Sequence, residues 1–98
     1  MPKTPQYINV MRYREGFYSH YFSGQTCGTG YAGGTIEECV EKVTRIAKEQ
    51  MQEGEIQIRS RLTLRDKYFH RQDLGKVEFQ RLVEILNNGN SEHRFVTE

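Results

Sequence analysis

The run Gly28-Thr29-Gly30-Tyr31-Ala32-Gly33 matches G-x-G-x-x-G, a spacing that can fold backbone around a phosphate. Thr35 follows as a potential helix cap, and a helix N-terminus attracts anions. One hypothesis is therefore a small phosphate- or nucleotide-binding protein centred on residues Gly28 to Gly34. The interpretation of this run as a wide turn that needs positive φ angles is favoured over a phosphate site, because the chain is too short for a dinucleotide-binding fold. In addition, Glu37 and Glu38 already occupy the positive end of the predicted helix.

Histidines and cysteines do not form a recognisable catalytic or metal-binding pattern in this sequence. His20, His70 and His93 lack partners at the spacings typical of metal sites. The spacing of Cys27 and Cys39 fits neither a disulfide framework nor a zinc knuckle, so we interpret both as reduced thiols. We therefore predict no catalytic residue, no metal, no cofactor and no enzymatic activity.

Cations and aromatic rings follow one another after residue 55. They comprise Arg59, Arg61 and Arg65 on one face of a predicted strand, then Lys67, Tyr68, Phe69 and Arg71. Such a basic strand face can bind RNA, single-stranded DNA or an acidic protein. The simpler interpretation is a solvated face whose arginines pair with helix glutamates of the same molecule, because the net charge is only +1.

A second candidate surface is an aromatic hairpin near the N-terminus. Its rings exceed what one face of two short strands can bury, and two arginines lie among them: Tyr13, Phe17, Tyr18, Tyr21 and Phe22, with Arg12 and Arg14. Exposed Tyr, Phe and Arg are typical of protein–protein hot spots. Core packing and cross-strand ring pairs explain the same residues equally well.

Five or six predicted elements must position these residues. Residues 6–14 and 17–23 read as an antiparallel hairpin in which Gly16 supplies a positive φ angle, and residues 29–32 could add a short strand. A capping box of Thr35 and Glu38 opens a helix that Gly54 ends. Residues 55–65 alternate as a strand, with Ile56, Ile58, Ser60, Leu62 and Leu64 on the core face.

A second helix is predicted from about residue 73 or 75 to 88, burying Leu74, Val77, Phe79, Leu82, Val83 and Leu86. The fold class is therefore α+β: two layers, with an antiparallel sheet of three to four strands and two helices on one face, in the order β-β-(β)-α-β-α. We expect one domain over residues 1–98, with flexible ends at about 1–5 and 90–98 apart from a possible docking of Phe95 and Val96.

Charge is segregated along the chain, with a net −3 over residues 35–55 and +4 over residues 56–76. This favours oriented association with a partner or a second copy. The sequence has neither a run of about 20 apolar residues nor an apolar secretory leader, so the expected location is the cytoplasm, without a membrane partner. A strand pair followed by the helix opening Gly34-Thr35-Ile36-Glu37-Glu38 resembles the β-β-β-α modules of HicB-like antitoxins.

These observations favour a small non-catalytic binding module, a protein–protein inhibitor, adaptor or regulator. The expected partner-binding residues are Arg12, Arg14, Phe17, Tyr18, Tyr21, Arg59, Arg61, Arg65 and Tyr68. The alternative is a nucleic-acid-binding regulator that uses the Arg59, Arg61 and Arg65 face. Another protein is the leading partner, nucleic acid is possible, and a homodimer is possible because small domains gain stability by pairing.

Overall fold

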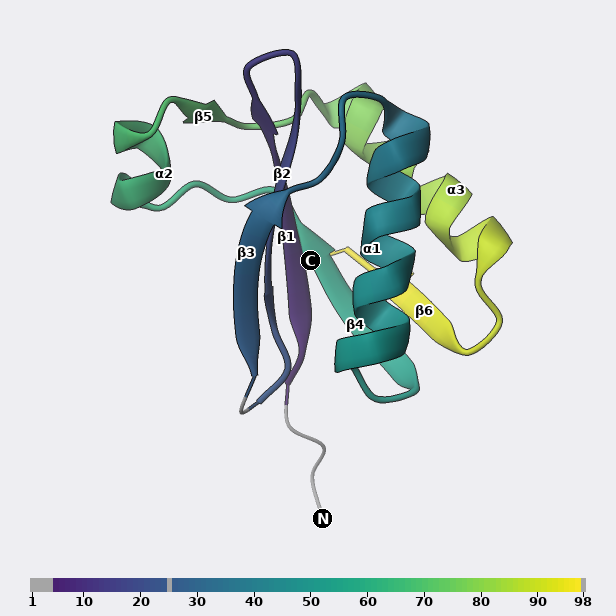
Figure 1. The fold of residues 1–98 in the computed structure, drawn as a ribbon. Helices are drawn as coiled ribbons and strands as arrows, with labels where there is room; N and C mark the ends of the chain where they lie inside the picture. Colours follow the sequence, from purple (N-terminus) through teal and green to yellow (C-terminus); the bar gives the residue numbers. More distant parts are fainter. Residues whose placement is uncertain (1–4, 25, 98) are drawn as a thin grey trace.

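The computed structural model describes residues 5–24 and 26–97 (Figure 1). The elements in chain order are β1 (Tyr7–Tyr13), β2 (Gly16–Phe22), β3 (Cys27–Tyr31), α1 (Ile36–Gln50), β4 (Gly54–Arg59), α2 (Leu64–Tyr68), β5 (Arg71–Gln72), α3 (Lys76–Gly89) and β6 (His93–Val96). The α+β class is confirmed. Of the N-terminal end that was expected to be flexible, residues 1–4 lie outside the described residues.

The sheet is mixed, which corrects the antiparallel sheet of three to four strands predicted above. Its order is β3-β2-β1-β4-β6, with the short β5 pairing β1. β1, β2 and β3 form an antiparallel meander, whereas β4 runs parallel to β1 and β6 runs parallel to β4. The parallel pairs arise because α1 precedes β4 and α3 precedes β6, and each helix returns the chain to the end of the sheet from which a parallel strand must start.

The helices α1 and α3 cover one face of the sheet, and α2 with β5 lies on the other side (Figure 1). Alternation along the strands sends one set of side chains toward α1 and α3. The resulting core consists of Ile8, Val10, Phe17, Ala32, Cys39, Val43, Ile46, Ala47, Ile56, Ile58, Leu74, Leu82, Leu86 and Phe95. Val77, predicted to be buried, is 80% exposed because α3 turns that position away from the sheet.

The predicted hairpin is confirmed, but its turn has a different conformation. Arg14 adopts the positive φ angle of 56°, a role that was assigned to Gly16. Gly16 is required for another reason: a Cβ there would lie 2.5 Å from the Gly33 carbonyl oxygen and 2.5 Å from the Tyr31 hydroxyl. This glycine therefore allows the turn that precedes α1 to pass close behind the hairpin.

β4 ends at Arg59, six residues before the predicted end of that strand. Thr63 and Asp66 form a capping box, in which the threonine hydroxyl accepts from the Asp66 N–H and the Asp66 carboxylate accepts from the Thr63 N–H. This local signal starts α2 and ends the extended segment. Leu64, predicted to be in the core, is consequently 85% exposed, and Arg65 lies on a helix.

The C-terminal segment, expected to be loose, contains the edge strand β6. Phe95 is buried against the core and pairs with Ile56 of β4. The Asn87 amide on α3 donates to the Phe95 carbonyl at 3.0 Å, and its oxygen accepts from the Phe95 N–H at 2.8 Å. The possible docking of Phe95 is therefore confirmed, and Phe95 belongs to a full strand of the sheet. Within the described ranges, no helix has the length and apolar character needed to cross a membrane.

Candidate functional site

The face of the sheet that points away from α1 and α3, called the open face below, carries two groups of aromatic rings. Tyr7 on β1 and Phe22 on β2 are stacked, with ring centroids 5.7 Å apart and planes 23° apart. His20 meets Tyr7 edge-on at 6.0 Å. Further along the same two strands, Tyr13 and Tyr18 meet at 5.7 Å. These contacts follow from the register, which places Tyr7 opposite Phe22 on one face.

Two arginines lie on these rings at cation–π distance. The Arg59 guanidinium on β4 is 3.7 Å from the Tyr7 ring centroid, and the Arg71 guanidinium on β5 is 3.7 Å from the centroid of Tyr18. Arg59 reaches Tyr7 because β4 is parallel to β1 and pairs Arg59 with Asn9, two residues along from Tyr7. The rings thus hold positive charge against the open face.

The segment between β4 and β5 folds over one end of the open face. Asn9, buried in β1, fixes it through two bonds: its amide donates to the Arg61 carbonyl at 2.6 Å, and its oxygen accepts from the Arg61 N–H at 2.7 Å. Met11, two residues along the same face, is completely buried. Because Asn9 pairs with backbone, α2 has a defined place above the sheet.

Asp66 on α2 holds this segment to β5. Its carboxylate accepts from Thr63 and from Arg71 Nη1, the latter at 2.7 Å, and its side chain is only 9% exposed. Burial opposes the charged form of Asp66 and by itself would raise its pKa. This effect is outweighed by hydrogen bonds from the Thr63 backbone, from Arg71 and from the Thr63 hydroxyl, and by the charge of Arg71. The pKa of Asp66 is therefore lowered below its ordinary value. Asp66 is therefore a charged, buried anchor, and it orients Arg71 over Tyr18.

A cavity of about 350 Å³ lies between α2 and the sheet. Its walls are formed by Tyr18, His20, Thr29, Thr63, Arg65, Asp66, Phe69 and Arg71. Asp66 is the acid in this lining, and it is engaged with Arg71. The hollow therefore offers positive charge beside ring edges, which suits a carboxylate or phosphate group.

Large apolar side chains project from α2 next to this cavity. Leu64 is 85% exposed, Tyr68 77% and Phe69 44%. Tyr68 and Phe69 meet edge-on at 5.3 Å, and Arg65 lies 6.0 Å from the Phe69 ring. Exposed aromatic side chains and arginines are enriched in protein interfaces.

The structure divides the predicted partner-binding residues between two sides of the sheet. Phe17 is core, Tyr21 packs partly against that core, and Arg12 pairs with Glu78 of α3 and lies 5.3 Å from the Phe17 ring. Phe17 is 3% exposed because its strand position faces α1 and α3, so it contributes to the core in this structure.

Other predicted residues do gather on the open face. Tyr18 and Arg59 lie on it, and Arg65 and Tyr68 belong to the α2 segment above it. Arg61, whose backbone binds Asn9, lies on the same segment. Arg14 sits at the hairpin turn, 5.2 Å from the Tyr13 ring.

Sequence reasoning missed Tyr7 and His20 as members of the site and gave Phe22 and Arg71 only a supporting place. The signal for the rings was present: strict alternation in two strands joined by a two-residue turn places Tyr7, His20 and Phe22 on one face. Arg71 had no such signal, because its contact with Tyr18 depends on the chain turning back through α2.

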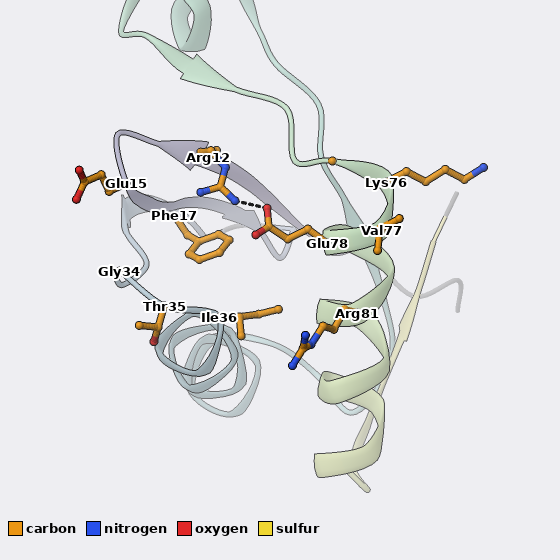
Figure 2. A pocket seen from close by; sticks show the side chains of 11 residues that line it. Arg12, Glu15, Phe17, Gly34, Thr35, Ile36, Lys76, Val77, Glu78 and Arg81 are labelled. Atoms are coloured by element: carbon orange, nitrogen blue, oxygen red, sulfur yellow. Dashed lines mark hydrogen bonds and ion pairs between the residues drawn. The ribbon is translucent and has the colours of Figure 1, made fainter.

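A larger cavity, of about 740 Å³, lies on the helix side between the first turns of α1 and α3 (Figure 2). Its lining consists of Arg12, Glu15, Phe17, Gly34, Thr35, Ile36, Gly75, Lys76, Val77, Glu78 and Arg81. Figure 2 shows the Arg12–Glu78 ion pair at one end, Arg81 pointing inward, and Lys76 pointing away. Because Arg12 and Glu78 neutralise each other, the net positive character of this cavity is small.

The glycine-rich segment is largely a strand. Gly28 and Gly30 belong to β3, whose partner β2 is antiparallel, and only Gly33 has a positive φ angle, of 95°, within residues 28–34. The Thr35 hydroxyl caps the first turn of α1 by accepting from the Glu38 N–H. The loop that the phosphate hypothesis required is therefore replaced by a sheet edge and a capped helix.

The two thiols lie in opposite environments. Cys27 is exposed on β3, and Cys39 is buried in α1. Burial, together with the negative charge of Glu78, raises the pKa of the Cys39 thiol to about 12. Over residues 5–24 and 26–97, no group of three or more His, Cys, Asp or Glu side chains could hold a metal ion.

Comparison with known proteins gives no further guide to function. No protein family, no curated protein and no solved structure matches this chain, and the resemblance of its helix opening to HicB-like modules is not joined by a family match. The geometry described above is therefore the basis for a functional proposal.

Proposed function

We propose that this protein is a non-catalytic binding module whose open face and α2 segment bind an acidic surface of another protein. The observation that carries the proposal is the protruding α2 segment: Leu64 and Tyr68 are 85% and 77% exposed beside the arginines of the open face. Apolar anchors within a ring of charge are the usual composition of an interface hot spot. Such binding requires area and charge complementarity but no reactive group.

The ring contacts favour protein over nucleic acid. A base binds a sheet surface by stacking on an open ring face. On this sheet the Tyr18 and Tyr7 rings already carry guanidinium groups at 3.7 Å, and Tyr7 also stacks with Phe22. The exposed groups are therefore cation heads and ring edges, which match carboxylates and apolar side chains better than bases.

Single-stranded nucleic acid is the second candidate because cations predominate on this side of the molecule. Arg65 and Lys67 on α2 are exposed, and Arg71 lies above Tyr18. Phosphate contacts give a steep dependence of affinity on salt, with a log–log slope of about −0.7 for each phosphate neutralised on a single strand. A protein interface of the proposed kind depends on salt less steeply, because its apolar anchors are insensitive to screening.

The test is capture of partners by tagged protein from a cell extract, with and without nuclease, followed by affinity measurement with the captured partner. We expect a stoichiometric protein that survives nuclease. Arg65→Glu combined with Tyr68→Ala should weaken its binding by roughly tenfold or more. The matched control is Lys48→Glu, an equal charge reversal at an exposed position of α1.

Two results would contradict the protein-binding proposal. One is equal binding by the wild type, the α2 double variant and the Lys48→Glu control, which would make the open face a solvated surface. The other is a captured fraction that nuclease removes completely, which would favour the nucleic-acid candidate.

A further inference from the structure

The free edge of β3 is an unprotected strand edge. β3 has a neighbour only on the β2 side in the described sheet. Its sequence, Cys27-Gly28-Thr29-Gly30-Tyr31, contains neither charge nor proline, the features with which proteins usually prevent strand pairing. Cys27, Thr29 and Tyr31 are all exposed. The edge is thus accessible to another strand.

The ladder with β2 determines which backbone groups are free to pair. Ala32 donates its N–H to the Phe17 carbonyl at 2.8 Å, and the register pairs Gly30 with Ser19 and Gly28 with Tyr21. Bonded and non-bonded pairs alternate in an antiparallel ladder, so the glycines exchange bonds with β2. The N–H and C=O groups of Cys27, Thr29 and Tyr31 therefore point outward.

The opposite edge of the sheet is closed by contrast. There the Asn87 side chain occupies both outward groups of Phe95, accepting from its N–H at 2.8 Å and donating to its carbonyl at 3.0 Å. An incoming strand would have to displace these two bonds. Among the described residues, β3 is therefore the longest strand with a free edge, and pairing of two copies through this same edge produces a closed dimer that does not propagate into a fibre.

We propose that two copies of this chain pair antiparallel through β3, with the two-fold axis at Thr29. The three outward-facing residues are centred on that position, so the register is self-complementary. Thr29 exchanges both backbone hydrogen bonds with Thr29 of the second copy. Cys27 lies opposite Tyr31 of the second copy, and Tyr31 lies opposite its Cys27.

The side chains suit this register. Tyr31 is 56% exposed, and in the pair it packs against a cysteine of the second copy instead of water. Gly30 has no neighbouring atom within 4 Å of a Cβ position, so the other side of the junction is not crowded there. Charged residues are missing from β3 itself, so no like charges oppose one another across the axis.

The pairing has a consequence for binding. A two-fold axis at right angles to the sheet keeps the two open faces on the same side. The dimer would therefore present two copies of the ring and arginine surface on one continuous sheet, with both α1 helices behind it. This arrangement suits a partner that is itself two-fold symmetric, because both copies can then bind at once.

Disulfide trapping tests the register directly. Wild-type Cys27 residues would lie four residue pairs apart across the axis, roughly 14 Å at 3.4 Å per residue, too far for a disulfide. In Cys27→Ser with Thr29→Cys, the new thiols face each other at a Cα separation of about 5.5 Å, which a disulfide can span. We expect mild oxidation to give a covalent dimer of this variant and no covalent dimer of the wild type.

Sedimentation equilibrium of the protein alone tests the pairing without any cysteine chemistry. Thr29→Lys places two positive charges at the axis and should give a monomer at concentrations where the wild type is dimeric. Thr97→Lys adds the same charge at an exposed position after β6 and should remain dimeric. The proposal is overturned if the wild type is monomeric throughout a dilution series, if Thr29→Lys associates like Thr97→Lys, or if the Thr29→Cys variant oxidises no faster than the wild type. None of these readouts involves the captured partner, so they succeed or fail separately from the proposed function.

Discussion

Replacing Asp66 with alanine tests whether the α2 segment is held to the sheet as described. The carboxylate accepts from the Thr63 N–H and hydroxyl, each at 2.9 Å, and from Arg71 at 2.7 Å. Arg71 in turn lies on Tyr18 of β2. Removal of the carboxylate leaves the Arg71 guanidinium, whose side chain is 14% exposed, without its ion-pair partner.

The expected cost follows from these contacts. Loss of a charge-assisted hydrogen bond to a buried cation costs about 2 kcal/mol, and loss of a helix cap costs about 1 kcal/mol. The total of about 3 kcal/mol agrees with the low end of measured costs for breaking a buried ion pair. A domain of this size has a free energy of unfolding of only about 5 to 15 kcal/mol, so the effect should be easily measurable.

Urea denaturation followed by tyrosine near-UV and far-UV circular dichroism measures this free energy. Asp73→Ala, at an exposed position, is the control and should change it by less than about 0.5 kcal/mol. Asp66→Ala and Arg71→Ala should be non-additive, because each removes the same pair. A loss below about 1 kcal/mol for Asp66→Ala, or full additivity with Arg71→Ala, would refute the proposed anchor.

The lowered pKa of Asp66 also gives a direction for pH dependence. A carboxyl whose folded pKa lies below its unfolded value of about 3.9 adds stability that is fully present above that value. This stability is lost as the pH falls through the folded pKa. Acid unfolding below about pH 4 should therefore be less pH-dependent in Asp66→Asn than in the wild type, as monitored by circular dichroism across an acid titration.

Three further predictions concern single positions. Gly33→Ala should lower the free energy of unfolding by at least about 1 kcal/mol, because Gly33 has a φ angle of 95° and a Cβ there would lie 2.4 Å from the Cβ of Glu38. Gly30→Val should be tolerated because the space beside Gly30 is open. Equal urea midpoints for the two variants would contradict this prediction. Cys27 should react with iodoacetamide at neutral pH, whereas Cys39 should remain unmodified in the folded protein because the Cys39 thiol is buried and has a pKa of about 12. Mass spectrometry of peptides distinguishes the two cysteines. Modification of both at similar rates would be the contrary result. His93 is 5% exposed, and neither ring nitrogen has a hydrogen-bond partner among the described residues. His93→Leu should therefore raise the thermal midpoint, by an amount that corresponds to about 1 kcal/mol in the free energy of unfolding. A lowered midpoint would show that the imidazole has a stabilising role.

Periodicity and capping signals predicted the elements where local sequence decides structure. The helix after Thr35 is confirmed because its cap and its apolar spacing specify the same element. The hairpin is confirmed because two alternating strands flank a short turn. The second capping box, Thr63 with Asp66, was equally local and could have ended the predicted strand at residue 59, but the alternation of Leu62 and Leu64 obscured it.

The site depended on alternation combined with pairing. Once β1 and β2 are paired, the face of each ring follows from its position, and Phe17 falls on the core side while Tyr18 falls on the open face. The sequence indicated the aromatic and basic character of both surfaces. It could not indicate that Arg71 would lie on Tyr18, because this contact joins residues that are distant along the chain.

The sequence alone determined the α+β class, the approximate positions of the hairpin and the two long helices, and the concentration of positive charge after residue 55, since all of these depend on local spacing and composition. The tertiary structure alone decided the parallel placement of β4 and β6, the location of α2 above the open face, and which sheet edge stays free. Those features depend on contacts such as Asn9 with Arg61 and Asn87 with Phe95. The energies of such contacts are realised only after the helices have brought distant strands together, so no local pattern in the sequence encodes them.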